Sequence, residues 1–388
     1  MPAEFLPGNR LTLLNSGVEF FPALLRAINE ARLEVHLESY IFENDDTGRT
    51  VAGALMAAAR RGLTVRLLVD GFGAPAFSRA LLPALSEAGV MAVVYRPDSA
   101  PLRLRRHRLR RLHRKLAVID GAIAFIGGIN IIDDRRPADG LPPRYDYAVR
   151  IEGPLLMPIQ RAMNLLWEIV TWVHLKRRYR MACNAPQRLA SAQGEQEAAF
   201  LVRDNIRHRR DIEDAYLEAI AGASRNILIA NAYFLPGRRF RRALSDAAKR
   251  GVAVTILLQG RIEYRLLHYA TQALYGQLLS SGIRLFEYRH SFLHAKVAVI
   301  DERWATVGSS NIDPFSLLLN KEANIVVRDA RFVDQLRLSL ENALREGAEE
   351  LPLHSWRRLP WPLALLRWAS YNVVRLAIGI AGYAGKEH

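Results

Sequence analysis

The strongest constraint on the fold is a pattern of 19 residues that occurs twice. Residues 112–130 read LHRKLAVIDGAIAFIGGIN, and residues 293–311 read LHAKVAVIDERWATVGSSN. Each copy has the order His-x-Lys-x-x-x-x-Asp, then six residues, then Gly-Gly-x-Asn or Gly-Ser-x-Asn. Only six of the 54 basic residues are lysines, and two of these six occupy the matching place. A chain that keeps these residues in register has built one half of a site twice. They are His113, Lys115, Asp120, Gly127, Gly128 and Asn130 in the first copy and His294, Lys296, Asp301, Gly308, Ser309 and Asn311 in the second.

The residues before the two motifs predict the same order of secondary structure. In each half an apolar strand, a helix that ends in glycine and a second apolar strand follow one another. This duplication predicts an α/β fold in which each half supplies a sheet with helices packed on it. We expect two α-β-α halves with mixed sheets, related by a pseudo-twofold axis around one shared active site. Strands are expected at 33–42, 63–71, 226–235 and 252–260, and helices at 50–62, 211–224 and 240–251.

The first copy contains an insertion directly before its histidine. From Tyr40 to His113 is 73 residues, whereas the matching interval from Tyr233 to His294 is 61 residues. The extra residues fall in 96–114, and the part 101–114 contains seven arginines interleaved with leucines. Arginine can bind lipid phosphates while leucine enters the apolar layer beneath them. We expect the insertion at the rim of the site, either on an anionic membrane surface or as a solvated basic loop.

Composition divides the chain into four parts. The polar residues 184–197 are expected to link an N-terminal half, 1–183, to a C-terminal half, 198–352. The last residues, 353–388, are basic and rich in tryptophan, and their apolar runs are far shorter than the roughly 20 residues that span a bilayer. We expect this tail to lie in a membrane surface, with packing on the protein's own core as the alternative. At helical spacing Arg367, Tyr371 and Arg375 share one face, and Trp356, Trp361 and Trp368 provide rings that favour the interface.

The charge of the chain indicates polyanionic partners. The formal net charge is +15, and half of the residues are apolar. We therefore expect a polyanion as partner, either nucleic acid or the phosphate surface of a membrane, and charge alone does not choose between them. Its one cysteine, Cys183, excludes an internal disulfide framework. The first thirty residues contain no apolar stretch typical of a cleavable signal peptide, so folding in the cytoplasm is expected.

The repeated residues have the chemistry of a site that cleaves phosphodiesters. Strand alternation places each histidine on one face with the lysine two residues later. The two ammonium groups and the amides of Asn130 and Asn311 can hold the oxygens of a phosphodiester. One imidazole can attack phosphorus while the other, protonated, gives its proton to the leaving alkoxide. A lysine beside each histidine disfavours a metal site, so neither metal nor cofactor is expected. Asp120 precedes glycine at an expected hairpin, which leaves a turn role and a catalytic role equally open.

These paired motifs resemble the phospholipase D superfamily. The segments RYDYAVRIEGP, ILIANAYFLPGRRF, LFEYRHSFLHAKVAVID and WATVGSSNIDPFSLLLNKEANIVV are similar to bacterial cardiolipin synthases of the B type, over about residues 8–350. The resemblance implies a metal-free reaction through a covalent phosphohistidine, with His113 as nucleophile and His294 as general acid. Because Gly128 stands where the second copy has serine, we expect the two histidines to differ in role. The other implied site residues are Lys115 and Lys296 as phosphate ligands, Asp120 and Asp301 within the catalytic motifs, Asn130, Ser309 and Asn311 beside the substrate, and Asp146 and Glu322 as carboxylates that steady the imidazoles.

The same resemblance implies the substrate. Phosphatidylglycerol would give its phosphatidyl group to the enzyme, and a second phosphatidylglycerol or a related alcohol would accept it, forming cardiolipin and releasing glycerol. A hydrolytic phospholipase D, a nuclease of the superfamily and a non-catalytic scaffold that binds acidic lipid are the alternatives. Aliphatic rather than aromatic residues interleave the arginines, so no nucleic acid is expected. The expected partners are phosphatidylglycerol and an anionic phospholipid membrane, with the protein peripheral on the cytoplasmic face of the cell membrane.

Overall fold

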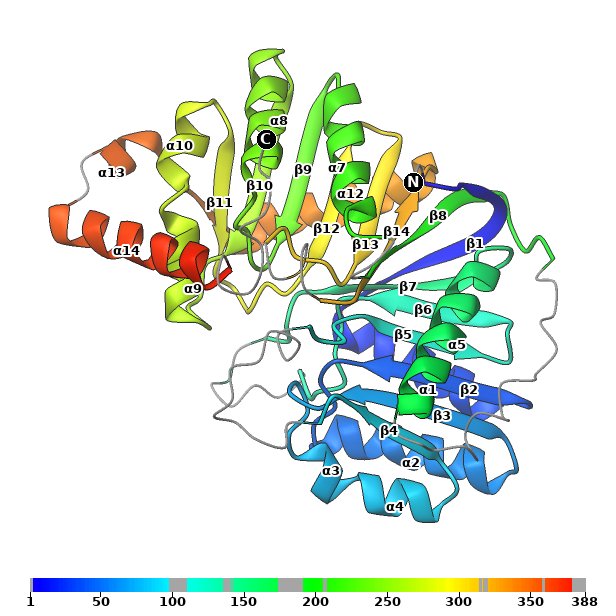
Figure 1. Ribbon diagram of the computed structural model, residues 1–388. Coiled ribbons are helices and arrows are strands. Elements are labelled where there is room, and N and C mark those ends of the chain that lie inside the picture. Colours follow the sequence, from blue (N-terminus) through cyan, green and yellow to red (C-terminus); the bar gives the residue numbers. More distant parts are fainter. Residues whose placement is uncertain are drawn as a thin grey trace.

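The fold consists of two halves with the same order of elements (Figure 1). The computed structural model describes residues 3–97, 110–134, 140, 142–173, 191–204, 208–313, 316, 320–357 and 360–378. The first half contains β1 (Leu6–Asn15), α1 (Ser16–Glu30), β2 (Glu34–Ser39), α2 (Asp46–Arg60), β3 (Thr64–Asp70), α3 (Phe77–Ala80), α4 (Leu82–Glu87), β4 (Met91–Tyr95), β5 (Lys115–Ile119), β6 (Ile123–Gly127), β7 (Tyr147–Glu152) and α5 (Leu156–Val173). The second half contains β8 (Gln196–Arg203), α7 (Asp211–Gly222), β9 (Asn226–Asn231), α8 (Arg238–Lys249), β10 (Ala253–Gln259), α9 (Arg265–Gln272), α10 (Tyr275–Ser280), β11 (Arg284–Tyr288), β12 (Lys296–Ile300), β13 (Trp304–Gly308), β14 (Glu322–Val327) and α12 (Ala330–Gly347). Three further elements follow, namely β15 (Ala348–Glu350), α13 (Leu353–Arg357) and α14 (Trp361–Ile378).

One sheet of 15 strands runs through both halves, in the order β15-β11-β10-β9-β12-β13-β14-β8-β1-β7-β6-β5-β2-β3-β4. Equivalent strands follow one another outward from the central β8–β1 pair in both directions. In each half β2, β3 and β4, or their counterparts β9, β10 and β11, are parallel, and the remaining strands pair antiparallel. This arrangement confirms the predicted α/β fold with two duplicated halves. The two expected sheets are joined into one because β1 pairs with β7 of its own half and with β8 of the other.

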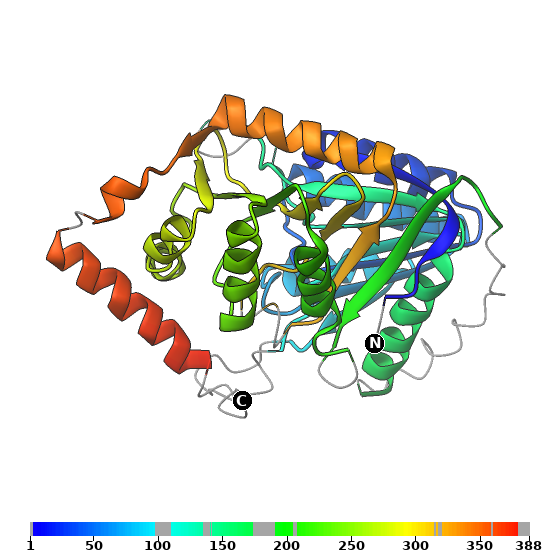
Figure 2. The same ribbon diagram turned by 90° about the horizontal axis from the view of Figure 1, so that it is seen from above.

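Helices cover both faces of the sheet and bury large apolar clusters. One cluster combines strand residues of both halves with α5 and α12, for example through Ile159 and Leu336. A second lies under α1 and α2, and a third under α7 and α8. Figure 2 shows α12 on the opposite side of the second-half strands from α7 and α8. Burying one leucine completely, as at Leu336, contributes roughly 1.5–3 kcal/mol, so the shared cluster holds the two halves firmly against each other.

Helix α14 carries the tryptophan-rich tail and packs along α9. Its inward face includes the buried Ser370 and Val374. The Arg367 guanidinium also faces inward and lies 4.2 Å from the centre of the Trp356 ring, where its apolar stem is covered while its charge contacts an aromatic face. One face of α14 therefore packs on the protein's own core, as the alternative in the sequence analysis predicts. The opposite face exposes Trp361, Leu365, Trp368 and Leu376. No helix in the described ranges is long and apolar enough to cross a membrane.

Several predicted boundaries differ from those observed by a few residues, and two of these differences have a clear local cause. Helix α2 begins at Asp46 instead of residue 50, because the Asp45 side chain accepts from the N–H of Gly48 at 2.8 Å and caps the helix. Strand β8 begins at Gln196, inside the expected linker 184–197, because Gln196 pairs with Asn9 of β1. Most of the arginine-rich insertion, 98–109, and the linker residues up to 190 lie outside the described residues.

Candidate active site

The two motifs meet where the halves contact each other. His113 lies just before β5, and His294 lies just before the equivalent strand β12. The backbone N–H of His113 donates to the carbonyl of Lys321 at 3.0 Å, and the N–H of His294 donates to the carbonyl of Tyr145 at 2.9 Å. Lys321 lies beside the start of β14 and Tyr145 beside the start of β7. Each histidine is therefore held by a strand end of the other half.

Each imidazole is also paired with a carboxylate of the other half. Nδ1 of His113 lies 3.0 Å from the carboxylate of Glu322, and Nδ1 of His294 lies 2.5 Å from that of Asp146. Both carboxylates are buried. Because an ionised carboxylate can only accept, Nδ1 carries the proton and Nε2 is left as the reactive nitrogen. Neither half thus holds a complete histidine–carboxylate pair by itself.

The difference between Gly128 and Ser309 follows from the acids beside them. A Cβ atom on Gly128 would lie 2.3 Å from Oδ1 of Asp146, so any side chain at this position displaces the carboxylate. The hydroxyl of Ser309 donates to Glu322 at 2.6 Å instead. Glycine in the first motif and serine in the second are therefore each matched to the acid of their own half.

The two lysines are buried beside the histidines. Nζ of Lys115 donates to the carbonyl of His113 at 2.6 Å, and Nζ of Lys296 donates to the carbonyl of His294. Nζ of Lys296 also lies 3.8 Å from Asp146. Burial lowers the pKa of Lys115 to about 7 and the pKa of Lys296 to about 8. A bound anion would stabilise both ammonium groups, so this part of the site favours a negatively charged ligand.

The electrostatic surroundings of the two imidazoles differ. Burial lowers the pKa of His113, and the adjacent Glu322 carboxylate opposes this effect. Burial together with the Lys296 ammonium lowers the pKa of His294 well below its ordinary value. Both rings are therefore neutral near neutral pH before an anion binds. Each lysine also acts on the imidazole of the other motif, which is consistent with one common site.

Two tyrosines, used in the sequence analysis only as landmarks, flank this site in different ways. The ring of Tyr40 lies 4.7 Å from the His113 ring between centroids, so it limits how far the imidazole can turn. The hydroxyl of the equivalent Tyr233 donates to Glu263 at 2.5 Å. The two halves are therefore unequal beyond the Gly128 difference.

The two motif asparagines are buried just after β6 and β13. Oδ1 of Asn130 accepts from the N–H of Ile41 at 3.2 Å, so this oxygen serves the fold. The side-chain oxygen of Asn311 has no hydrogen-bond partner among the described residues. The side-chain oxygen of Asn311 can therefore accept a further hydrogen bond.

The structure does not bring Asp120 and Asp301 to the histidines. They follow the far ends of β5 and β12, and a five-residue strand spans roughly 16 Å. The Asp120 carboxylate accepts from three consecutive backbone N–H groups, those of residues 32–34, at 2.8–2.9 Å. Asp301 accepts in the same way from residues 224–226. Their φ angles of 53° and 50° are left-handed, a conformation that aspartate tolerates in turns. Both aspartates therefore act in turns, and they do not lie with the histidines and lysines with which the motif groups them.

Two side chains that the sequence analysis did not single out hold the loops that carry the histidines. Asp70, at the end of β3, accepts from the backbone N–H of Leu112 at 2.8 Å. Gln259, at the end of β10, accepts from the N–H of Leu293 at 3.2 Å. A signal was present in the sequence, because Asp-Gly and Gln-Gly close equivalent apolar strands in the two halves.

Two arginines near His113 form ion pairs with acidic residues of the protein itself. Arg114 forms a buried ion pair with Glu38 and donates to the carbonyl of Ala162 in α5 at 3.1 Å. The Arg111 guanidinium lies 3.8 Å from Asp70. The lipid-binding role expected for the seven arginines of 101–114 therefore does not extend to these two.

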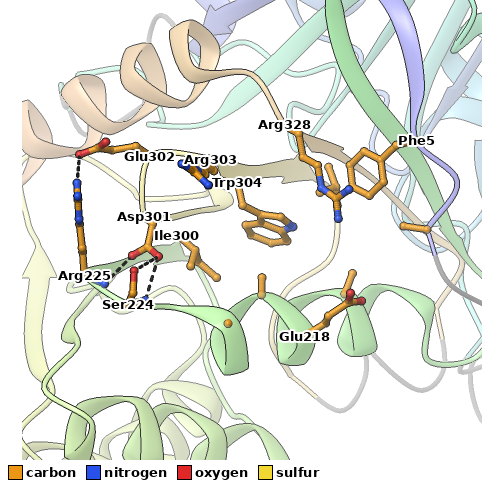
Figure 3. Close-up of a pocket in the computed structure, with 15 residues that line it drawn as sticks. Phe5, Glu218, Ser224, Arg225, Ile300, Asp301, Glu302, Arg303, Trp304 and Arg328 are labelled. Atoms are coloured by element: carbon orange, nitrogen blue, oxygen red, sulfur yellow. Dashed lines mark hydrogen bonds and ion pairs between the residues drawn. The ribbon is translucent and has the colours of Figure 1, made fainter.

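A cavity between a helix and a hairpin lies away from the motif histidines and lysines. It has a volume of about 480 Å³ and opens between α7 and the β12–β13 hairpin (Figure 3). Its lining includes Arg225, Asp301, Trp304 and Arg328 but none of the motif histidines or lysines. The cavity lies at the Asp301 end of β12, opposite the end where Lys296 lies, and we assign it no part in the reaction. Neither this cavity nor any other described part of the chain gathers three His, Cys, Asp or Glu side chains that could hold a metal ion.

Both halves match a known protein family. The family described as "Cardiolipin synthase, PLD-like domain" matches residues 24–139 and 216–344. The chain belongs to this family. Cardiolipin synthase B of Escherichia coli (strain K12) is 37% identical over 402 residues, which cover 97% of this chain and 94% of that protein. Cardiolipin synthase B of Salmonella typhi is 39% identical over 366 residues, which cover 92% of this chain and 87% of that protein.

Membership of the PLD-like cardiolipin synthase family confirms the predicted relationship and makes the chain an enzyme of the phospholipase D superfamily. The solved structure of phosphatidylserine synthase from Haemophilus influenzae Rd KW20 is similar with a TM-score of 0.69 at 14% sequence identity. The match covers 97% of this chain and 96% of that one. This likeness extends over the whole two-half fold.

Proposed function

We propose that this protein transfers a phosphatidyl group from phosphatidylglycerol, through a covalent phosphohistidine, to a second phosphatidylglycerol or a related alcohol. The observation that carries the proposal is the exchanged pairing of His113 with Glu322 and of His294 with Asp146. Two such imidazoles beside two buried lysines suit a double displacement at phosphorus. The lipid class of the substrate comes from the relatives, which are named cardiolipin synthases.

In the first step, Nε2 of His113 attacks the phosphorus while Glu322 holds its Nδ1–H. A P–N bond forms, and the bond from phosphorus to the oxygen of the headgroup glycerol breaks. His294 gives its proton to that oxygen, so glycerol leaves. The bound phosphodiester anion raises the pKa of His294, which allows this ring to take up the proton that it donates. Lys115 and Lys296 bind the non-bridging oxygens and balance their charge.

In the second step, the hydroxyl of the acceptor phosphatidylglycerol attacks the phosphohistidine. His294, now neutral, takes the hydroxyl proton, and the P–N bond breaks. Cardiolipin leaves and the His113 imidazole is restored. Water in place of the acceptor would give phosphatidic acid, so the choice between transfer and hydrolysis depends on which hydroxyl reaches phosphorus.

The enzyme must meet its lipid at a membrane. We place the halves 1–183 and 198–352, joined by the linker 184–197, on the cytoplasmic face of the cell membrane. The tail 353–388 supplies one contact, because its outward face exposes apolar and tryptophan side chains. The other five arginines of residues 101–114 supply positive charge close to the first histidine in the sequence.

The direct test is to identify the products that the purified protein forms from phosphatidylglycerol vesicles. Mass spectrometry is expected to find cardiolipin and glycerol in equal amounts. His113→Ala is expected to abolish both products and any acid-labile phosphoprotein. His294→Ala should slow glycerol release by roughly 10²–10⁴-fold, because its proton is lost from the leaving group. Phosphatidic acid as the main product would identify a hydrolase, and normal turnover by His113→Ala would remove it as the nucleophile.

A further inference from the structure

Helix α5 of the first half has an exposed apolar stripe. Its inward face is buried, and Trp167 on that face is fully covered. On the opposite face Leu165, Ile169, Trp172 and Val173 are 59%, 51%, 63% and 64% exposed. These residues follow the spacing i, i+4, i+7 and i+8, which places them side by side on a helix. Contiguous exposed apolar surface of this kind marks a site of interaction.

The charge that follows this stripe indicates the kind of partner. From Ile169 to Gly194 the sequence contains no aspartate and no glutamate, and residues 176–180 read KRRYR. An apolar helical face with tryptophan, followed by basic residues, has the composition that binds anionic phospholipid. Charge complementarity thus favours a lipid surface over a second copy of this basic chain, whose net charge of +15 would repel it.

The stripe is rigidly connected to the first motif. Val170 of α5 packs in one buried cluster with Leu112, the residue before His113. The carbonyl of Ala162 in α5 accepts a hydrogen bond from Arg114, the residue after His113. In Figure 2 the C-terminal ends of α5 and α14 both point toward the lower edge of the view. A membrane that contacts α5 therefore has a fixed position relative to the histidine.

We propose that the outer face of α5, formed by Leu165, Ile169, Trp172 and Val173, is a second membrane-docking surface that binds anionic bilayers together with the tail. The bilayer is also the source of substrate in the proposed function, and to that extent the proposal rests on it. Attachment through α14 alone would let the molecule pivot about its tail. One contact from the first half and one from the tail instead fix the shared site toward the lipid and make the second contact intramolecular, which strengthens binding.

The experiment measures how the full-length protein sediments with vesicles of phosphatidylglycerol and phosphatidylethanolamine. The variant Ile169→Ser/Trp172→Ser removes the centre of the stripe. A matched control, Val18→Ser/Leu338→Ser, changes residues that are 56% and 45% exposed on α1 and α12. The α5 variant should bind about tenfold more weakly, because two apolar side chains no longer enter the lipid, whereas the control should bind as the wild type does. Equal thermal unfolding midpoints will show that both variants fold.

Activity on two forms of substrate separates this proposal from the proposed function. The α5 variant should keep the wild-type rate on phosphatidylglycerol in detergent micelles and lose activity only on vesicles. Wild-type binding of vesicles by the α5 variant would overturn the proposal. So would a shift from dimer to monomer in gel filtration with vesicle binding intact, which would assign the stripe to self-association. A wild-type protein that transfers nothing in either form would end the proposed function, while the sedimentation result still decides the role of α5.

Discussion

At the scale of single residues, the site depends on how burial sets the protonation of its groups. Burial lowers the pKa of Lys115 to about 7 and of Lys296 to about 8, and it raises the pKa of Asp146 to about 6. Each shift disfavours the charged form in the absence of a ligand. In the proposed function, the negative charge of the bound phosphodiester stabilises the ammonium form of both lysines, so substrate binding and lysine protonation are coupled.

These shifts predict a narrow pH optimum for the free enzyme. Below pH 6 Asp146 takes up a proton and no longer accepts from His294 as a carboxylate. Above pH 7 to 8 Lys115 and Lys296 lose their protons and bind the phosphate less well. We therefore expect kcat/KM to be highest between about pH 6 and 7 and to fall on both sides. Initial rates in mixed micelles from pH 5 to 9 will measure this profile.

A substitution can identify the alkaline limb of the profile. Lys115→Arg carries its charge throughout this pH range, because arginine does not lose its proton in proteins. The limb should move to higher pH in this variant, at a lower absolute rate, since the guanidinium does not fit the ammonium site. An alkaline limb that stays in place would show that a group other than Lys115 causes it.

At the scale of secondary structure elements, the two motif hairpins act as anchors. Asp120 joins the β5–β6 turn to the start of β2, and Asp301 joins the β12–β13 turn to the start of β9. Each aspartate accepts hydrogen bonds from three consecutive backbone N–H groups. The last residue of the His-x-Lys-x-x-x-x-Asp pattern therefore fixes the strand that carries the histidine, from its far end.

This anchor role gives a stability prediction. Asp120→Ala removes three hydrogen bonds and places alanine at a positive φ, so the free energy of unfolding should fall by about 2–3 kcal/mol. Asp120→Asn keeps one acceptor and tolerates the left-handed conformation, so its loss should be about 1 kcal/mol. Denaturant unfolding will measure both values. At temperatures where the variants are folded, their kcat should stay within about twofold of the wild type, and a larger loss would return Asp120 to the catalytic group.

The same elements show what the sequence can predict about the site. The duplication, the face shared by histidine and lysine, and the involvement of Asp146 and Glu322 could all be anticipated, because spacing and resemblance fix them. The pairing of each acid with the histidine of the other half could not be anticipated. Strand periodicity predicts which face of the sheet a residue lies on, but it does not predict which segment packs against that face. The inward turn of Arg367 on α14 was missed for a related reason, since its ring partner Trp356 precedes the helix.

At the scale of the whole molecule, duplication has produced one site and not two. The sheet continues through β1 and β8, and an apolar cluster on one face joins the halves. Each histidine takes its carboxylate and a backbone acceptor from the other half. In the proposed mechanism the relative position of the halves is therefore part of the active site, and the core shared across both halves holds that position.

Because each histidine is paired with a carboxylate of the other half, we predict that a substitution of the acid in one half impairs the step carried out by the histidine of the other half. Asp146→Asn weakens the proton transfer from His294, so the rate with phosphatidylglycerol should fall roughly 10–100-fold. A phosphatidyl ester of p-nitrophenol needs little proton donation, so its burst of p-nitrophenol should fall less than about threefold in the same variant. Glu322→Gln disturbs the nucleophile His113 and should slow both substrates.

Comparing the two leaving groups makes this prediction decisive. If Asp146→Asn slows both substrates while Glu322→Gln spares the p-nitrophenyl ester, the roles of His113 and His294 are reversed. If both variants slow both substrates equally, the carboxylates support the junction between the halves and not the individual rings. The expected result, a leaving-group dependence in Asp146→Asn alone, requires that an acid of the first half controls a histidine of the second.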